Sequence, residues 1–190
     1  LKDADEILKA DRETVLAAVK KNYQQLQYAD KSLKGDREIV LAAVMQSGWA
    51  LKDADEILKA DREFILEAVK QSDHQTLGFA DKSLNSDREI VLEAVKKSGA
   101  ALQYADKSLR ADREIVHTAV NSNAHILEYA DKNLKADREI VLAAVKMSGW
   151  DLHHADESLK SDRDIVLEAV KSEGSAIEFA SKTLQADREI

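Results

Sequence analysis

The stretch Asp87–Leu109, DREIVLEAVKKSGAALQYADKSL, predicts the fold, because variants of it recur along the whole chain. It opens with the tripeptide Asp-Arg-Glu, once Asp-Arg-Asp, whose copies are spaced by 25 residues except for one spacing of 26. The copies begin at positions 11, 36, 61, 87, 112, 137, 162 and 187. The extra residue falls between Gln71 and Thr76, where the other copies predict a loop. A fixed period with an insertion confined to a loop is typical of repeat architectures.

A second motif, Leu-x-x-Ala-Asp-x-x-Leu, keeps the same period. It starts at positions 1, 26, 51, 77, 102, 127 and 152, and Ile177 opens a variant. Residues 1–13 and 51–63 are identical, LKDADEILKADRE. This identity indicates duplication of a unit made of two repeats.

Each repeat predicts two short helices. The first begins with Asp36 or its equivalent as N-cap and has an acidic residue such as Glu38 in its first turn. In some copies its end is marked by a glycine suited to a left-handed C′ position; these are Gly48, Gly99, Gly149 and Gly174. The second helix carries the apolar stripe Leu26, Ala29 and Leu33. The link to the next Asp is so short that neighbouring helices must be antiparallel.

These elements predict an all-α fold, an α-solenoid of stacked antiparallel helix pairs with a 25-residue repeat. Helices of about ten residues are unstable alone, so stacking must supply the core. We expect residues 1–190 to form a single helical array of about seven and a half repeats. We also expect it to be a piece of a longer array.

The composition excludes several classes of function. The 190 residues contain no cysteine, which rules out disulfides and thiolate chemistry. The longest apolar run, residues 39–44, is far too short to span a bilayer. A net charge of −8 with both signs interspersed disfavours nucleic acid as a partner. We therefore expect a cytoplasmic protein that binds neither membrane nor nucleic acid and needs no cofactor.

The recurring charges predict a structural ladder. The Arg of each Asp-Arg-Glu shares a face with apolar residues of the first helix, and the Asp of each Ala-Asp shares the apolar face of the second. We expect Arg–Asp pairs between the helices, since every copy uses Arg and none uses Lys. The predicted arginines are Arg12, Arg37, Arg62, Arg88, Arg113, Arg138 and Arg163, and the predicted acids are Asp30, Asp55, Asp81, Asp106, Asp131 and Asp156.

One position of the second helix is aromatic in most copies. It holds Tyr28, Phe79, Tyr104, Tyr129 and Phe179, with His154 in one copy. These rings either cover the groove between layers or anchor an extended partner. Trp49 and Trp150 occupy equivalent positions four repeats apart, and each either caps the second helix or acts as an anchor. All eight residues are therefore candidates for partner binding.

The five histidines do not predict a metal site. His74, His117, His125, His153 and His154 show no HExxH or comparable spacing, and adjacent side chains such as those of His153 and His154 point about 100° apart on a helix. We predict neither metal-binding nor catalytic residues. We interpret His117, which replaces a leucine, as a local weakening of the core.

The pairing of DREIVLAAVKxSG with LxYADKSLK resembles the repeats of domain of unknown function 4116 over essentially the whole chain. The resemblance implies a tandem array of helical repeats. It supplies no catalytic or ligand-binding residues that could be transferred to this sequence.

We expect a non-enzymatic scaffold or protein-interaction module that binds a protein or peptide, with self-association left open. The alternative is a purely structural spacer, a self-assembling element or an engineered repeat protein with no selected ligand. The two differ in surface chemistry: a binding module has one face that varies between copies, whereas a spacer is uniformly charged. The variable residues Trp49, Trp150, His153 and His154 favour binding.

Overall fold

The computed structural model describes residues 1–187 and residue 190, and its described elements are all helices. The predicted all-α solenoid is confirmed. The chain divides into two compact units, Leu1–Lys97 and Ser98–Ile190. The helix predicted after Asp187 would begin in residues 188 and 189, which lie outside the described residues.

Each repeat contains one long helix followed by two shorter ones, which we call the middle helix and the short helix. In the first unit the long helices are α2 (Arg12–Lys21), α3 (Arg37–Val44), α5 (Arg62–Gln71) and α7 (Arg88–Lys97). The middle helices are the 3-10 helices η1 (Tyr23–Tyr28) and η3 (Gly48–Asp53) and the α-helix α6 (Gln75–Phe79). The short helices are α1 (Glu6–Ala10), η2 (Lys31–Gly35), α4 (Glu56–Ala60) and η4 (Lys82–Ser86).

The second unit repeats this order. Its long helices are α8 (Arg113–Ser122), α9 (Arg138–Met147) and α10 (Arg163–Ser172). The middle helices are η5 (Gly99–Tyr104), η7 (Leu127–Tyr129), η9 (Gly149–His154) and η11 (Gly174–Phe179). The short helices are η6 (Leu109–Ala111), η8 (Leu134–Ala136), η10 (Leu159–Ser161) and α11 (Lys182–Gln185).

The long helices begin as the sequence predicts. The Asp36 carboxylate accepts hydrogen bonds from the backbone N–H groups of Glu38 and Ile39 at 3.0 and 3.1 Å, which satisfies donors that the first turn leaves free. Asp112, Asp137 and Asp162 cap α8, α9 and α10 in the same way. Each cap therefore fixes where a long helix starts.

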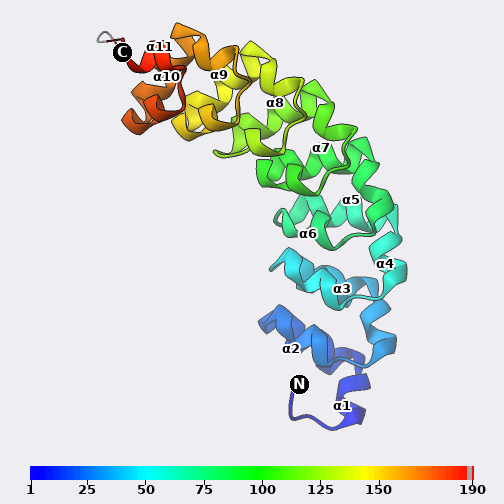
Figure 1. Cartoon of the computed structure of the whole chain (residues 1–190). Coiled ribbons are helices and arrows are strands. Elements are labelled where there is room, and N and C mark those ends of the chain that lie inside the picture. Colours follow the sequence, from blue (N-terminus) through cyan, green and yellow to red (C-terminus); the bar gives the residue numbers. More distant parts are fainter. Residues whose placement is uncertain (188–189) are drawn as a thin grey trace. The chain divides into compact units, whose positions relative to one another are not determined.

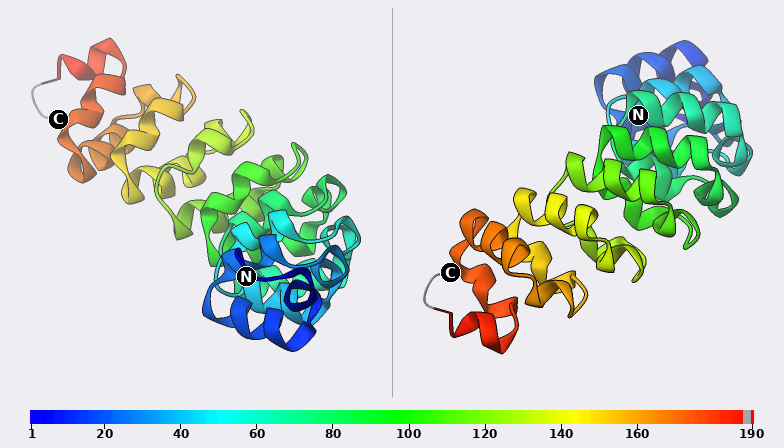
Figure 2. Two further views of the ribbon diagram at one scale, coloured as in Figure 1. Left: turned by 90° about the horizontal axis from the view of Figure 1, so that it is seen from below. Right: turned by 90° about the horizontal axis from the view of Figure 1, so that it is seen from above.

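The long helices of neighbouring repeats pack side by side within each unit, as α2 does on α3 and α8 on α9 (Figure 1; two further views in Figure 2). In α3 the buried residues Ile39, Val40, Ala43 and Val44 form the contact face. A leucine in every middle helix except η11 completes the core, and the solvent reaches none of Leu26, Leu51, Leu77, Leu102, Leu127 and Leu152. Burying each such side chain contributes about 1.5–3 kcal/mol.

The predicted second helix is wrong in one respect, because it is two helices. Ala29 and Asp30 adopt extended conformations between η1 and η2, with ψ of 150° at both residues. The Asp30 carboxylate accepts a hydrogen bond from the backbone N–H of Ser32 and so starts a new helix. Aspartate is a better N-cap than an interior helical residue, and this preference breaks the stripe that a single helix would need.

The prediction of left-handed glycines is also wrong, since no described glycine has a positive φ. Three of the four glycines serve close approach between repeats instead. A Cβ on Gly99 would overlap the carbonyl oxygen of Ala119, and one on Gly149 would overlap that of Ala169. A Cβ on Gly48 would likewise overlap the backbone N–H of Thr76, whereas a Cβ on Gly174 would meet nothing within 4 Å.

Candidate functional site

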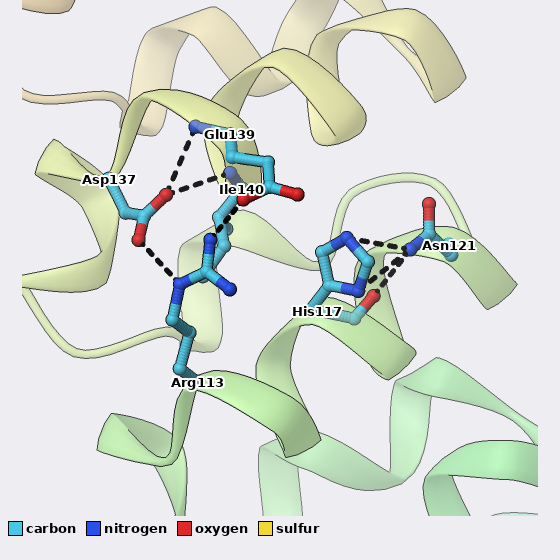
Figure 3. A network of polar contacts seen from close by, with 6 residues as sticks. All are labelled: Arg113, His117, Asn121, Asp137, Glu139 and Ile140. Carbon is cyan, nitrogen blue, oxygen red and sulfur yellow. Dashed lines mark hydrogen bonds and ion pairs between the residues drawn. The ribbon is translucent and has the colours of Figure 1, made fainter.

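The Arg ladder exists, but the prediction of its partners is wrong. Each ladder arginine whose pairing is described reaches the Asp that opens the next Asp-Arg-Glu or Asp-Arg-Asp motif, as Arg12 Nε does with Asp36 at 2.7 Å. Arg113 pairs with Asp137 at 2.9 Å and also contacts Glu139 (Figure 3). Nε likewise joins Arg62 to Asp87, Arg138 to Asp162 and Arg163 to Asp187, whereas Arg37 reaches Asp61 through Nη1.

These pairs have an electrostatic signature. The hydrogen bond from Arg12 is the largest cause that holds the pKa of Asp36 below its ordinary value, and burial opposes it. The arginines are about half exposed, so each ion pair is worth less than about 1 kcal/mol. The ladder therefore joins one repeat to the next and offers no free charge for a ligand.

The acids that the sequence assigned to the ladder do a different job. Asp30 accepts hydrogen bonds from the backbone N–H and the hydroxyl of Ser32 at 2.9 and 2.6 Å, and these bonds lower its pKa. Its own N–H donates to the carbonyl of Lys9, one repeat earlier, at 2.9 Å. Asp55 and Asp81 likewise cap short helices. Asp106, Asp131 and Asp156 each accept a hydrogen bond from the backbone N–H two residues later, in the turn that leads into a short helix.

The two tryptophans stand apart from this regular framework. Trp49 and Trp150 are 47% and 46% exposed, which is unusual for the largest apolar side chain. Each indole packs against the phenylalanine of the next middle helix. The ring centroids of Trp49 and Phe79 are 5.0 Å apart, and those of Trp150 and Phe179 are 5.2 Å apart. The structure thus brings four of the eight predicted residues together in two pairs.

In the second unit this pair becomes a larger cluster. The His153 ring lies 4.9 Å from Phe179 and 5.0 Å from His154, with tilts of 61° and 76°. Together with Trp150 and His125 these rings line a surface hollow of about 330 Å³. The predicted residue His154 is therefore part of this site. Tyr28, Tyr104 and Tyr129 are partly buried at the same position of their own middle helices and do not line it.

Sequence reasoning missed the residue behind this hollow, Asp151. Its side chain is 1% exposed, and burial raises its pKa to about 6. One carboxylate oxygen accepts a hydrogen bond from the backbone N–H of His125 at 3.0 Å, and the other has no partner among the described residues. The signal was present in the sequence, because the same position holds Ala50, Ala101 and Ala176 in the other glycine-bearing copies.

The backbone beside Asp151 is irregular. His125 has a φ of 59°, a value that only a few per cent of non-glycine residues adopt. The middle helix that follows, η7, has only three residues, whereas η5, η9 and η11 have six. The Asp151 carboxylate accepts the N–H of His125 at the point where the other copies form a further turn of helix. This hydrogen bond places His125 on the rim of the hollow.

The equivalent place in the first unit is different. Trp49 lines a smaller hollow of about 180 Å³ with Tyr23, Gln24, Gln27, Lys52 and Asp53. Charged side chains thus stand where the second unit has His153 and His154, and Ala50 stands where it has Asp151. The two tryptophan sites share a framework but not a chemistry.

Metal ligands and membrane-spanning helices both bear on function. No group of three or more His, Asp or Glu side chains in the described part of the chain is placed to hold a metal ion. Among the same residues, no helix has the length and apolar character needed to cross a membrane.

The stacked helices, the ladder and the repeated caps define the chain as a helical repeat protein. The chain belongs to the family described as domain of unknown function (DUF4116). Overlapping matches to this family cover residues 1–34, 11–59, 36–85, 61–110, 87–135, 112–160 and 137–185. Comparisons with the curated proteins and with the solved structures found no match.

Proposed function

We propose that this repeat array is a non-enzymatic interaction module whose exposed aromatic residues bind a protein or peptide partner. The observation that carries the proposal is the exposure of Trp49 and Trp150. Each indole packs against a phenylalanine and leaves about half of its surface exposed to solvent. Tryptophan is enriched among the residues that dominate binding energy at interfaces. An indole needed only for packing would bury more of its surface.

The methionines support the same assignment. The chain has two, Met45 and Met147, and each lies at the end of the long helix that precedes a tryptophan. Both are about half exposed, at 52% and 48%. Methionine is enriched at interfaces because its flexible side chain adapts to a partner. Two exposed apolar residue types thus occur together in the same two repeats.

A selection from a library of random peptides displayed on phage tests the proposal. The immobilised chain is the target, and the double variant Trp49→Ala and Trp150→Ala is the matched competitor in solution. We expect peptides that bind the chain and lose at least ten-fold in affinity for the variant, because the removed side chains are the anchors.

The rival function, a spacer without a ligand, makes the opposite prediction. It is favoured by the ladder, which repeats in each unit with little variation. Selected peptides that bind the chain and the variant equally, or no enrichment above an unrelated helical protein, would remove the case for an aromatic binding surface.

A further inference from the structure

The hollow in the second unit departs from the repeat in three ways at one place. Asp151 puts a carboxylate at a position that is alanine in the other glycine-bearing copies, His125 adopts a left-handed backbone, and Trp150 exposes its indole. A repeat array stabilises itself by regularity, so three coincident departures need a cause of their own. Departures of this kind are expected at functional sites.

The carboxylate of Asp151 forms no ion pair in the described structure. Ladder acids such as Asp137 are paired with arginine, whereas Asp151 accepts a hydrogen bond from the backbone N–H of His125 and keeps a second oxygen that is buried without a hydrogen bond. Burial raises its pKa by more than the nearby backbone N–H groups and the charge of His125 lower it, so its negative potential is only partly compensated. A positive charge at the hollow would compensate the remainder.

The aromatic rings around the hollow also favour a positive charge. Trp150 and Phe179 are tilted by 59° and His153 and Phe179 by 61°, so the rings form inclined walls rather than a flat stack. The face of an indole or phenyl ring attracts cations. The chain already uses this contact elsewhere, since the guanidinium carbon of Arg37 lies 5.2 Å from the centre of the Phe64 ring.

We propose that the hollow lined by His125, Trp150, His153, His154 and Phe179 binds an arginine side chain of a partner polypeptide. The guanidinium stacks on the rings, and the negative potential of Asp151 behind the wall strengthens its binding. This inference rests on the proposed interaction function and names the chemistry that one of its two sites recognises. The volume of about 330 Å³ lies at the lower end of ligand pockets and matches a side chain rather than a large ligand.

Arginine fits better than lysine for a physical reason. Its guanidinium is planar and more weakly hydrated than an ammonium group, so stacking on aromatic rings costs it less solvation. The first unit provides the internal control, because Lys52 offsets the charge of Asp53 in the lining of the Trp49 hollow and Ala50 replaces the buried carboxylate. The Trp49 site should therefore not select a cation.

The test uses two peptides that differ in charge alone: Gly-Gly-Arg-Gly-Gly and the same peptide with citrulline in place of arginine. Both are titrated into the isotopically labelled chain while the indole N–H resonances of Trp150 and Trp49 are followed by NMR. We expect the arginine peptide to shift the Trp150 signal, with at least five-fold higher affinity than the citrulline peptide. The Trp49 signal should stay in place at the same concentrations.

Two variants separate the contributions. Asp151→Asn keeps an oxygen that can accept the N–H of His125, so the loop is retained, and the loss of charge should weaken arginine binding at least three-fold. Trp150→Ala, followed through the amide signals of His153 and His154, should weaken it at least ten-fold. Trp49→Ala is the matched control and should leave the affinity unchanged.

Equal affinities for the two peptides, no shift at Trp150, an Asp151→Asn variant that binds as well as the parent, or an equal response at Trp49 would each overturn the proposal. The library selection distinguishes this failure from failure of the proposed function. Selected peptides that depend on Trp150 but contain no arginine would leave an interaction module with a different preference, whereas no selected peptides would end both.

Discussion

At the scale of the residue, Asp151 shows how a repeat gives up stability at one position. Its pKa rises from an ordinary value of 3.8 to about 6 because burial disfavours the charged form. The folded state therefore binds the proton more tightly than the unfolded state does. The resulting penalty is fully present above about pH 6 and is lost as the pH falls toward 4.

Asp151→Asn should consequently stabilise the chain at pH 7.5. A rise in pKa from 3.8 to about 6 corresponds to roughly 3 kcal/mol, and we expect a gain of about 1–3 kcal/mol because the loop relaxes around the charge. The measurement is urea denaturation of both proteins between pH 4 and pH 8. The difference in unfolding free energy should shrink below pH 6 and vanish near pH 4.

The difference between the two proteins is the quantity to compare, because many capping carboxylates, such as Asp36 and Asp162, have lowered pKa values and weaken both proteins alike in acid. A variant less stable than the parent at pH 7.5 would show that the carboxylate stabilises the His125 loop by more than its burial costs.

Glycine provides a second prediction at this scale, with a control inside the same unit. Gly99→Ala should lower the unfolding free energy by about 1–3 kcal/mol, since its Cβ would overlap the backbone of Ala119 in the next repeat. Gly174→Ala, whose Cβ has free space, should change it by less than about 0.5 kcal/mol. Similar losses at both positions in thermal or urea denaturation would show that the effect is conformational and not a matter of close approach.

At the scale of the element, the sequence predicted the long helices well and the second half of the repeat poorly. The Asp caps and the dense apolar face leave little choice for Asp36–Val44. The stripe of Leu26, Ala29 and Leu33 fits one helix equally well, and nothing in its spacing reveals that Asp30 caps a new one. A capping residue and an interior residue look alike when the apolar period continues through them.

The same ambiguity explains the error in the ladder. Two aspartates recur in every repeat but the last, where Ser181 replaces the second, and the sequence assigned the capping role to Asp36 and the pairing role to Asp30. In the structure Asp36 does both. Its Oδ2 accepts from Arg12 Nε at 2.7 Å, and its Oδ1 accepts from the helix N-terminus and also from Arg12 Nη2 at 3.3 Å. Sequence spacing cannot show that one side chain satisfies two demands.

A double-mutant cycle on Arg113 and Asp137 tests this dual role. Asp137→Ala should cost about 0.5–2 kcal/mol because it removes a cap, whereas Arg113→Ala should cost less than about 1 kcal/mol. Their coupling should be a few tenths of a kcal/mol and fall as salt rises, since the Arg113 side chain is 52% exposed.

The matched control is a second double-mutant cycle, on Arg113 and Asp131, the class of acid that the sequence predicted as the partner of the arginines. The Asp131 carboxylate accepts the N–H of Asn133 in the turn before η8, so it should show no coupling to Arg113. Equal coupling in the two cycles would indicate long-range electrostatics instead of a specific pair.

At the scale of the whole molecule, the period of 25 residues was enough to predict a solenoid, because each repeat has one apolar column that only a neighbour can cover. The candidate site was predicted less completely. Trp150, His154 and Phe179 were identified by comparing copies, but the hollow itself depends on a shortened helix η7 and on Asp151, and a local change in backbone path leaves no periodic signal.

Stability in such an array should be local, and hydrogen exchange can measure this. Ile65 and Ile165 lie in the first turns of α5 and α10, one in each unit, and both are fully buried. Replacing either with alanine leaves a cavity that should cost about 2–5 kcal/mol. Because each repeat contacts only its neighbours, Ile65→Ala should reduce amide protection in α5 and in α3 and α7, on which α5 packs, and leave α9 and α10 protected.

Ile165→Ala is the reciprocal control. It should reduce protection in α10 and in α9, which packs on it, and leave α2 and α3 as they are in the parent chain. Both variants should be compared under conditions in which less than a few per cent of the chain is globally unfolded, so that local opening dominates exchange. A uniform loss of protection along the whole chain in either variant would mean that the repeats unfold as one cooperative body. The pattern we expect requires instead that the contacts between adjacent repeats, rather than a shared core, hold the array together.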